Sequence, residues 1–209
     1  MQSNRTDIMP PKRKSTPKKK RASKKKSSTL QLNKEEIEST PNGQTNSSPR
    51  EEQKEQTNTS YVTLNEGPQQ EFIDAPEREV LYGGAAGGGK SFALLIDPLR
   101  YCQHPDHSAL ILRRTNDELR ELIHKSTELY PKFYRGAKWS ERKSQWTFPS
   151  GARIWLTYLE QDKDVLRYQG QSFSYVGFDE LTQYPTAFPW DYLRSRLRST
   201  NPEIKVYMR

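Results

Sequence analysis

Apolar side chains gather in short runs along the second part of the chain, and stretches with a helical period separate these runs. Short runs that are continuously apolar, or that alternate with polar residues, are typical of strands. We expect strands at residues 79–82, 109–112, 144–148, 152–158, 175–178 and 203–208. The stretches between them predict helices at residues 90–101, 116–129 and 190–198, and a helical turn at 162–168.

Two local signals refine this pattern. The turn residues Pro149, Ser150 and Gly151 separate two alternating runs, which predicts a hairpin. Asn116 precedes two acidic residues, so we expect it to cap the helix that follows. Residues 184–189 are expected to form a loop before the last helix.

The alternation of strands and helices predicts an α/β fold. Consecutive strand–helix units favour a mostly parallel sheet with helices on both faces. Residues 61–209 are expected to form this domain, because their aromatic content suits a packed core. The chain stops inside its last apolar run, and few strands are visible to cover the sheet edge. We therefore interpret the domain as incomplete at its C-terminus.

Residues 1–60 lack the apolar pattern and are dominated by Lys, Ser, Thr, Glu, Gln, Asn and Pro. This composition is typical of a disordered tail. The net charge of +8 lies almost wholly there, in the Lys-rich stretch between Arg5 and Lys26. Three interpretations stay open for this stretch: a polyanion-binding arm, a tail without a specific role, and a nuclear localisation signal.

Composition also limits the other classes of protein. No apolar run approaches the ~18 residues of a membrane span, so we expect no membrane partner. A single cysteine excludes an intrachain disulfide. A polar loop is the interpretation for the segment that contains Cys102, His104, Asp106 and His107, since this is not a recognised set of metal ligands.

A glycine-rich octapeptide carries the strongest chemical signal. It matches G-x-x-x-x-G-K-[ST] and consists of Gly84, Ala85, Ala86, Gly87, Gly88, Gly89, Lys90 and Ser91. Such a loop binds nucleoside triphosphates, because glycines let backbone N–H groups converge on phosphate oxygens. Lys90 would reach the β- and γ-phosphates, and Ser91 would ligate Mg²⁺, so ATP and Mg²⁺ are the expected cofactors. A strand before the loop and a helix after it argue against a flexible linker.

An acidic pair at the end of a later apolar run completes the candidate site. Asp179 would hold Mg²⁺ together with Ser91, and Glu180 would act as the general base that activates water. A solvated acidic turn is the alternative for an Asp-Glu pair taken alone. Glutamate next to the metal-binding aspartate is typical of motor-type P-loop ATPases. Lys90 and Glu180 are therefore the candidate catalytic residues.

Several motifs together resemble one family. The segments 79–91, 110–115, 167–182 and 193–200 are similar to the ATPase domain of phage terminase large subunits, and the likeness extends over about residues 67–209. The resemblance implies a P-loop NTPase fold of the ASCE type. It also implies ATP hydrolysis coupled to translocation of double-stranded DNA into a capsid, in the cytoplasm of the host cell. The implied partners are the capsid portal, the small terminase subunit and further copies of the chain in a ring.

The resemblance also assigns roles to individual residues. It makes Gln70, with Gln69 as the alternate, the glutamine that senses adenine. An arginine should complete the ATP site of a ring motor, and the candidates are Arg113, Arg114, Arg167, Arg194, Arg196 and Arg198. The family's coupling motif and its nuclease domain are missing from this sequence, so we expect no nuclease activity.

Two other functions remain open from the residues alone. A helicase-like nucleic-acid remodelling ATPase would share the phosphate loop and the acidic pair. A non-catalytic fragment that binds nucleotide or DNA would use the Lys-rich tail and would not hydrolyse ATP.

Overall fold

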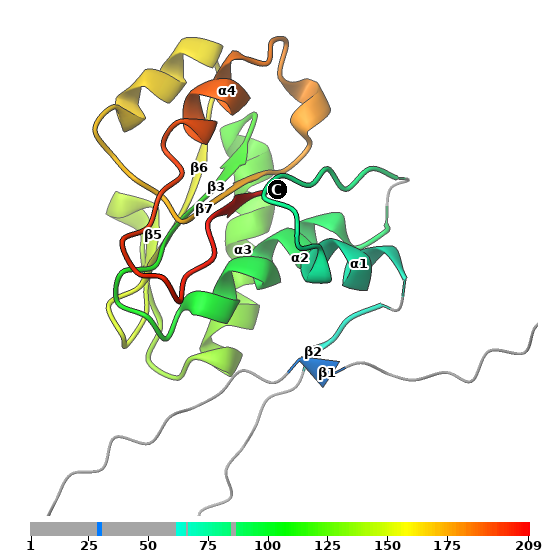
Figure 1. Cartoon of the computed structure of the whole chain (residues 1–209), viewed down its shortest axis with the longest axis vertical. Coiled ribbons are helices and arrows are strands. Elements are labelled where there is room, and N and C mark those ends of the chain that lie inside the picture. Colours follow the sequence, from blue (N-terminus) through cyan, green and yellow to red (C-terminus); the bar gives the residue numbers. More distant parts are fainter. Residues whose placement is uncertain (1–28, 31–61, 66, 85–86) are drawn as a thin grey trace, which may run out of the picture.

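The computed structural model describes residues 29–30, 62–65, 67–84 and 87–209. Residues 67–84 and 87–209 contribute to a six-stranded sheet and to the helices around it (Figure 1). Strand β1 (Thr29–Leu30) pairs antiparallel with strand β2 (Val62–Thr63). Apart from β1, the predicted disordered tail lies outside the described residues.

The main sheet has the order β4-β5-β6-β3-β7-β8. Its strands are β3 (Ser108–Arg113), β4 (Lys138–Ser140), β5 (Gln145–Thr147), β6 (Arg153–Tyr158), β7 (Tyr175–Phe178) and β8 (Tyr207–Met208). Strands β6, β3, β7 and β8 run parallel, whereas β4, β5 and β6 form antiparallel neighbours. The α/β prediction and the hairpin of β5 with β6 are therefore confirmed, while β4 was not predicted.

The α-helices are α1 (Pro68–Asp74), α2 (Lys90–Ile96), α3 (Asn116–Phe133) and α4 (Phe188–Arg194). Short 3-10 helices are η1 (Asp97–Tyr101), η2 (Glu141–Lys143), η3 (Asp162–Tyr168) and η4 (Leu181–Gln183). Among the described residues, no helix combines the length and the apolar character that crossing a bilayer requires.

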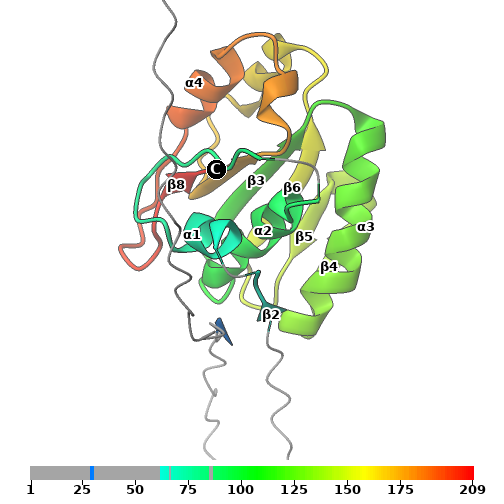
Figure 2. The ribbon, with the colours of Figure 1, turned by 90° about the vertical axis from the view of Figure 1, so that its right-hand side faces the viewer.

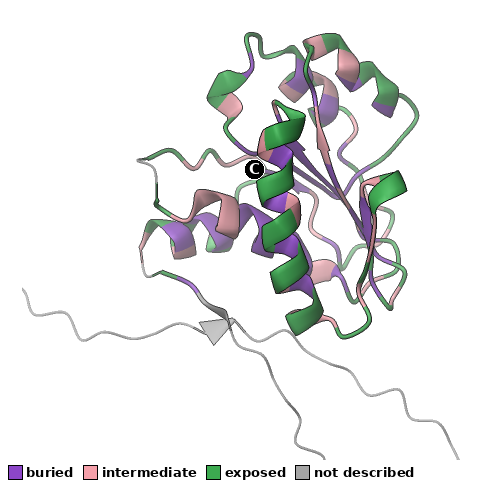
Figure 3. Cartoon of the chain, turned by 180° about the vertical axis from the view of Figure 1, so that it is seen from behind, coloured by how far each residue is buried: buried purple, intermediate pink, exposed green. Residues whose placement is uncertain are grey.

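Helices cover both faces of the sheet, as predicted. Neighbouring residues of a strand point to opposite faces, so β3 contributes side chains to two hydrophobic cores, one on each face of the sheet. Ala109 and Ile111 pack with residues of α1, α2 and α3, whereas Leu110 and Leu112 pack with η3 and α4. Figure 2 shows α1, α2 and α3 gathered at one face of the sheet, and Figure 3 shows that α3 turns its buried side inward.

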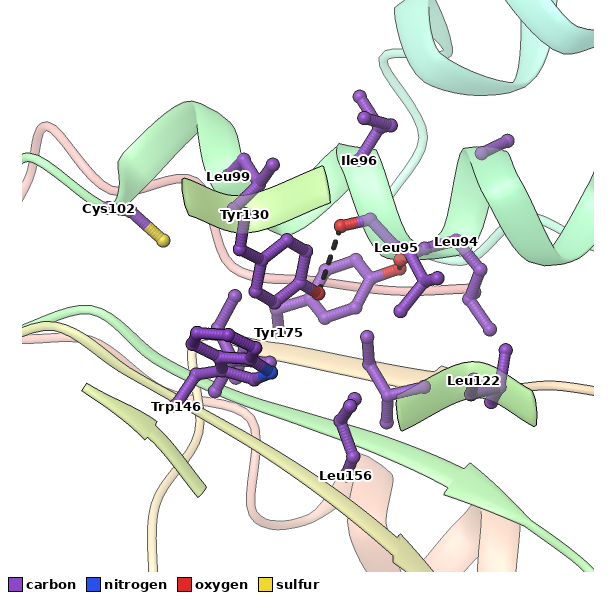
Figure 4. Packing of buried hydrophobic residues seen from close by; sticks show 14 of the residues in the cluster. Leu94, Leu95, Ile96, Leu99, Cys102, Leu122, Tyr130, Trp146, Leu156 and Tyr175 are labelled. Atoms are coloured by element: carbon purple, nitrogen blue, oxygen red, sulfur yellow. Dashed lines mark hydrogen bonds between the residues drawn. The ribbon is translucent and has the colours of Figure 1, made fainter. Parts of the chain in front are cut away.

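Tyrosine hydroxyls stabilise the end of helix α2 and the start of η1. Pro98 has no N–H, so it cannot donate to the carbonyl of Leu94 as the helix would require. The hydroxyl of Tyr175 donates to that carbonyl instead, at 3.2 Å. Three more such bonds run from Tyr130 to Leu95 O (3.2 Å), from Tyr207 to Asp97 O (3.2 Å) and from Tyr134 to Leu99 O (2.8 Å). Figure 4 shows Tyr130 reaching the helix from within the core.

Two predicted strands are much shorter than expected. The run at 79–82 forms only one bridge, between Glu79 and Met208, supported by a bond from Val80 N to Met208 O at 3.1 Å. Its partner β8 offers two residues, because the chain before it turns through a bond from Ile204 N to Asn201 O. The run at 79–82 therefore has only a two-residue strand as its neighbour.

Helix boundaries also differ from the sequence prediction. The cap of α3 is Thr115, not Asn116: its side chain accepts from Glu118 N at 3.4 Å. Helix α4 begins at Phe188, inside the predicted loop, because Pro189 fits a first helical turn that needs no N–H from it. It ends at Arg194, since Leu197 forms a bridge to Phe173. The predicted helix 90–101 changes to a 3-10 helix at Asp97, next to Pro98.

The segment interpreted as a polar loop is partly a core element. Cys102 and His107 are fully buried, while His104 lies 3.3 Å from Glu203. Burial lowers the pKa of His107 to about 4. The part of the chain that the structure describes contains no group of three His, Cys, Asp or Glu residues suited to a metal.

Candidate functional site

The glycine-rich loop leads from the bridge at Glu79 into helix α2, and side chains at its base hold its backbone. The hydroxyl of Tyr82 donates to Gly88 O at 3.0 Å, and the ammonium of Lys90 donates to Gly84 O at 3.1 Å. Both side chains thus bond to loop carbonyls. Gly84, Gly87 and Gly88 are exposed, as a loop that cradles phosphate requires.

Among the described glycines of the loop, Gly89 is the one where a side chain would clash. Its φ of +74° lies in the left-handed region. A Cβ at this position would lie 2.6 Å from Nε2 of Gln69. Glycine is therefore required there both by backbone conformation and by the close approach of a neighbouring side chain.

Gln69 lies against the loop, and Gln70 bonds within its own helix. The buried amide of Gln69 accepts from Asn65 N at 2.7 Å and donates to Gly89 O at 3.0 Å. The amide of Gln70 donates to Asp74 within helix α1. The structure thus brings the alternate residue, Gln69, to the phosphate loop.

Asp179 follows strand β7 and joins the two halves of the site. It is 3% exposed, and its Oδ1 accepts from the hydroxyl of Ser91 at 3.1 Å across 88 residues of chain. Its Oδ2 accepts a hydrogen bond from Nε of Arg113 at 2.7 Å, and Nη2 of the same guanidinium lies 2.7 Å from Oδ2 in an ion pair. A hydroxyl and a carboxylate, the two predicted Mg²⁺ ligands, therefore lie in contact at the start of α2.

Glu180 is exposed and turns away from the strand. It adopts a left-handed conformation with φ of 54° and ψ of 52°. Such a conformation costs a non-glycine residue roughly 1–3 kcal/mol and is often found at functional sites. Glu180 lines a cavity of about 180 Å³ whose walls also include Gly84, Lys90, Asp179 and Arg209. The structure thus brings both candidate catalytic residues to one cavity.

Among the described residues, Arg113 is the only candidate arginine that bonds to a predicted site residue, Asp179. Arg114 pairs with Asp162, Arg194 with Glu79, and Arg198 with Ser172. Arg167 bonds to the carbonyl of Tyr158, and Arg196 stacks on Tyr192.

Sequence reasoning missed two contributions to the site. It did not foresee that Arg113 would pair with Asp179, although both residues end neighbouring parallel strands, whose carboxyl ends meet at one edge. It also missed Arg209, which lines the cavity and bonds to Asp97 at 3.1 Å. No motif in the sequence pointed to Arg209.

Comparison with protein families agrees with the motifs. Residues 81–205 match the family described as terminase large subunit, T4likevirus-type, N-terminal, which is more than half of the chain. The chain belongs to this family. A comparison with curated proteins gave no match.

Membership in the terminase large subunit family associates the chain with phage DNA packaging. The matched segment contains the whole phosphate loop, the Arg113–Asp179 pair and Glu180, whereas Gln69 and Gln70 precede it. The resemblance inferred from the motifs is thereby confirmed at the level of the family. The packaging role also takes precedence over the helicase-like interpretation.

Proposed function

We propose that this terminase domain binds ATP with Mg²⁺ and hydrolyses it to drive double-stranded DNA into a capsid. The observation that carries the proposal is the 3.1 Å contact between Ser91 and Asp179. A P-loop ATPase needs a hydroxyl at the start of the loop helix and a carboxylate at a neighbouring strand end, both close to the phosphates.

The sheet topology supports a P-loop NTPase fold of the ASCE type for residues 61–209. Strands β3, β7 and β8 are parallel neighbours, and the segment before the loop bridges to β8. The loop and the acidic pair therefore lie at the carboxyl edge of the sheet, where ligands bind in open α/β folds.

The residues present fit ATP and Mg²⁺. Backbone groups of the glycine loop and the ammonium of Lys90 would hold the phosphates, and Lys90 would exchange its bond to Gly84 O for them. Ser91 and Asp179 supply oxygen ligands, which Mg²⁺ prefers. Mg²⁺ bound there would neutralise negative charge on the phosphate oxygens.

Glu180 is suited to activate water. Its carboxylate is exposed at the cavity that Lys90 and Asp179 also line, so a water molecule can reach it. As general base it would accept a proton from the water that attacks the terminal phosphate. Its neighbour Asp179 is held by Ser91 and Arg113 and so is unsuited to that role.

The test compares nucleotide binding with phosphate release in the purified chain. We expect the wild type to bind a fluorescent ATP analogue with Mg²⁺ and to release phosphate. Glu180→Gln should keep binding but lower turnover by about 10²-fold or more. Lys125→Ala, an exposed change on α3, is the matched control and should behave as wild type. Absence of Mg²⁺-dependent binding in the wild type, or full turnover in Glu180→Gln, would refute the proposal.

A second experiment addresses the DNA partner. We propose that the portal, the small subunit and a ring of copies assemble with this domain in the host cytoplasm, and that duplex DNA raises its turnover. Mixing the chain with portal-bearing procapsids should give DNA-dependent docking. Strand separation of a forked duplex without docking would instead support a helicase-like ATPase.

A further inference from the structure

We infer that Arg113 is a positioning residue that orients the carboxylate of Asp179 for Mg²⁺. The inference rests on the proposed function and assigns the guanidinium a task within its own subunit. Nε and Nη2 of Arg113 both reach Oδ2 of Asp179 at 2.7 Å, whereas Oδ1 accepts from Ser91 at 3.1 Å. One carboxylate oxygen is thus clamped, and the other faces the residue expected to share the metal.

Main-chain hydrogen bonds hold the backbone of both Arg113 and Asp179. The carbonyl of Arg113 accepts from Leu159 N at 3.0 Å, and Asp179 N donates to Leu112 O at 2.9 Å. The two side chains are only 9% and 4% exposed. Because Arg113 ends β3 and Asp179 directly follows the adjacent strand β7, the guanidinium approaches the carboxylate from a fixed direction.

This placement separates Arg113 from an arginine that acts on a neighbouring subunit. Such an arginine must project from the surface, but the side chain of Arg113 is buried and committed to Asp179. A charge-assisted hydrogen bond from a planar guanidinium has a fixed direction, whereas a point charge does not, and the second nitrogen adds an ion pair to the same oxygen. Residues that orient a metal ligand from behind typically change metal affinity by about 10- to 100-fold when they are replaced.

The distinguishing variant is Arg113→Lys, which keeps the positive charge but replaces the planar guanidinium with a flexible point charge. The readout is the ratio of nucleotide affinities with and without Mg²⁺, measured by titrating a fluorescent ATP analogue. We expect Arg113→Lys to lower this ratio about 10-fold, with Mg²⁺-free affinity unchanged. The half-saturating Mg²⁺ concentration for turnover should rise in parallel.

Arg100→Lys is the matched control, because Arg100 also pairs with a buried aspartate, Asp97, at 2.5 Å, and neither residue lines the cavity. Its Mg²⁺ ratio should equal that of the wild type. If Arg113→Lys does not fold, judged by thermal melting, Arg113→Gln provides a neutral donor for the same titration and should lower the ratio at least as much.

The outcomes separate the inference from the proposed function. A wild type that binds nucleotide with Mg²⁺ dependence, and an Arg113→Lys chain with the same ratio, would overturn the role of Arg113 alone. An equal loss in Arg100→Lys would likewise overturn it, because the effect would then be general destabilisation. A wild type without Mg²⁺-dependent nucleotide binding would remove both proposals.

Discussion

The glycine loop at residues 83–89 and the end of strand β7 lie next to each other in the site, but different interactions hold them. Two side chains, Tyr82 and Lys90, bond to loop carbonyls in an exposed setting. Asp179 instead sits in a buried ion pair with Arg113, between two central strands. The loop side is therefore held locally, whereas the strand side is part of the framework of the sheet.

Mutations on the two sides should therefore affect different quantities: the loop side mainly ligand binding, and the strand side mainly the stability of the fold. A change on the loop side removes contacts that cost little to lose in the unliganded protein. A change on the strand side leaves a buried charge without its partner, which destabilises the fold itself. The four predictions below test this separation, in order of the expected change in the free energy of unfolding.

The largest loss of stability is expected for Asp179→Asn. The variant keeps the shape of the side chain but leaves the buried guanidinium of Arg113 without a negative partner. Breaking a buried ion pair costs roughly 3–5 kcal/mol. Denaturant unfolding measures this cost, and Asp106→Asn in an exposed loop is the control that should stay within about 0.5 kcal/mol. Equal stability of the two variants would show that the strand side is no more structural than the loop.

The opposite ends of β3 and β7 provide a pH-dependent comparison. His107 precedes β3, is buried, and lies with Nδ1 2.9 Å from the hydroxyl of Ser174, just before β7. Burial lowers the pKa of His107 from 6.5 to about 4, which disfavours its charged form. The resulting stabilisation is present above pH 6.5 and is lost as the pH falls through about 4.

Between pH 6.5 and pH values below about 4, the free energy of unfolding should fall by roughly 3 kcal/mol. Unfolding in denaturant at a series of pH values measures it. His107→Asn, which keeps polar atoms for Ser174, should lose markedly less stability over the same range. A variant with the same pH profile as the wild type would show that His107 is not the group that titrates.

A smaller loss is expected for Gly89→Ala on the loop side. The left-handed φ of +74° costs an alanine about 1–2 kcal/mol, and its Cβ would also press on Gln69. Gly83→Ala is the matched control, because no atom lies within 4 Å of its added Cβ. Adding Gln69→Ala should relieve the clash and leave the strain. Thermal unfolding of the single and double variants separates the two costs, and an unchanged single variant would contradict the loop geometry.

The smallest change in stability is expected for Lys90→Ala, within about 0.5 kcal/mol, because its bond to Gly84 O is exposed. Its nucleotide affinity should nevertheless fall about 10²-fold, since the charge that faces the phosphates is lost. Unfolding and nucleotide titration on the same preparation test this contrast. A large stability loss with unchanged nucleotide affinity would reverse the comparison between the two sides.

The sequence allowed the loop, the acidic pair and their contact to be predicted, because a strand–loop–helix order and an apolar run ending in Asp179 leave few alternatives. It did not reveal the partner of Arg113, since any arginine at a strand end can face solvent, DNA or a carboxylate. The choice between Gln69 and Gln70 depended on how helix α1 rotates against the loop. The prediction of a strand at 79–82 was wrong, because such a strand would have to pair with β8, which is short and distant in sequence.

The tyrosine hydroxyls that bond to helix α2 and η1 determine how late in synthesis this helix can reach its final structure. They connect Leu95 to Tyr130 across 35 residues, Leu94 to Tyr175 across 81, and Asp97 to Tyr207 across 110. A growing chain on the ribosome therefore exposes the helix long before it supplies these partners. Contacts this distant in sequence slow folding, because the connecting segments must be ordered first. The phosphate loop, which leads into this helix, thus reaches its final setting only after Tyr207 has been made.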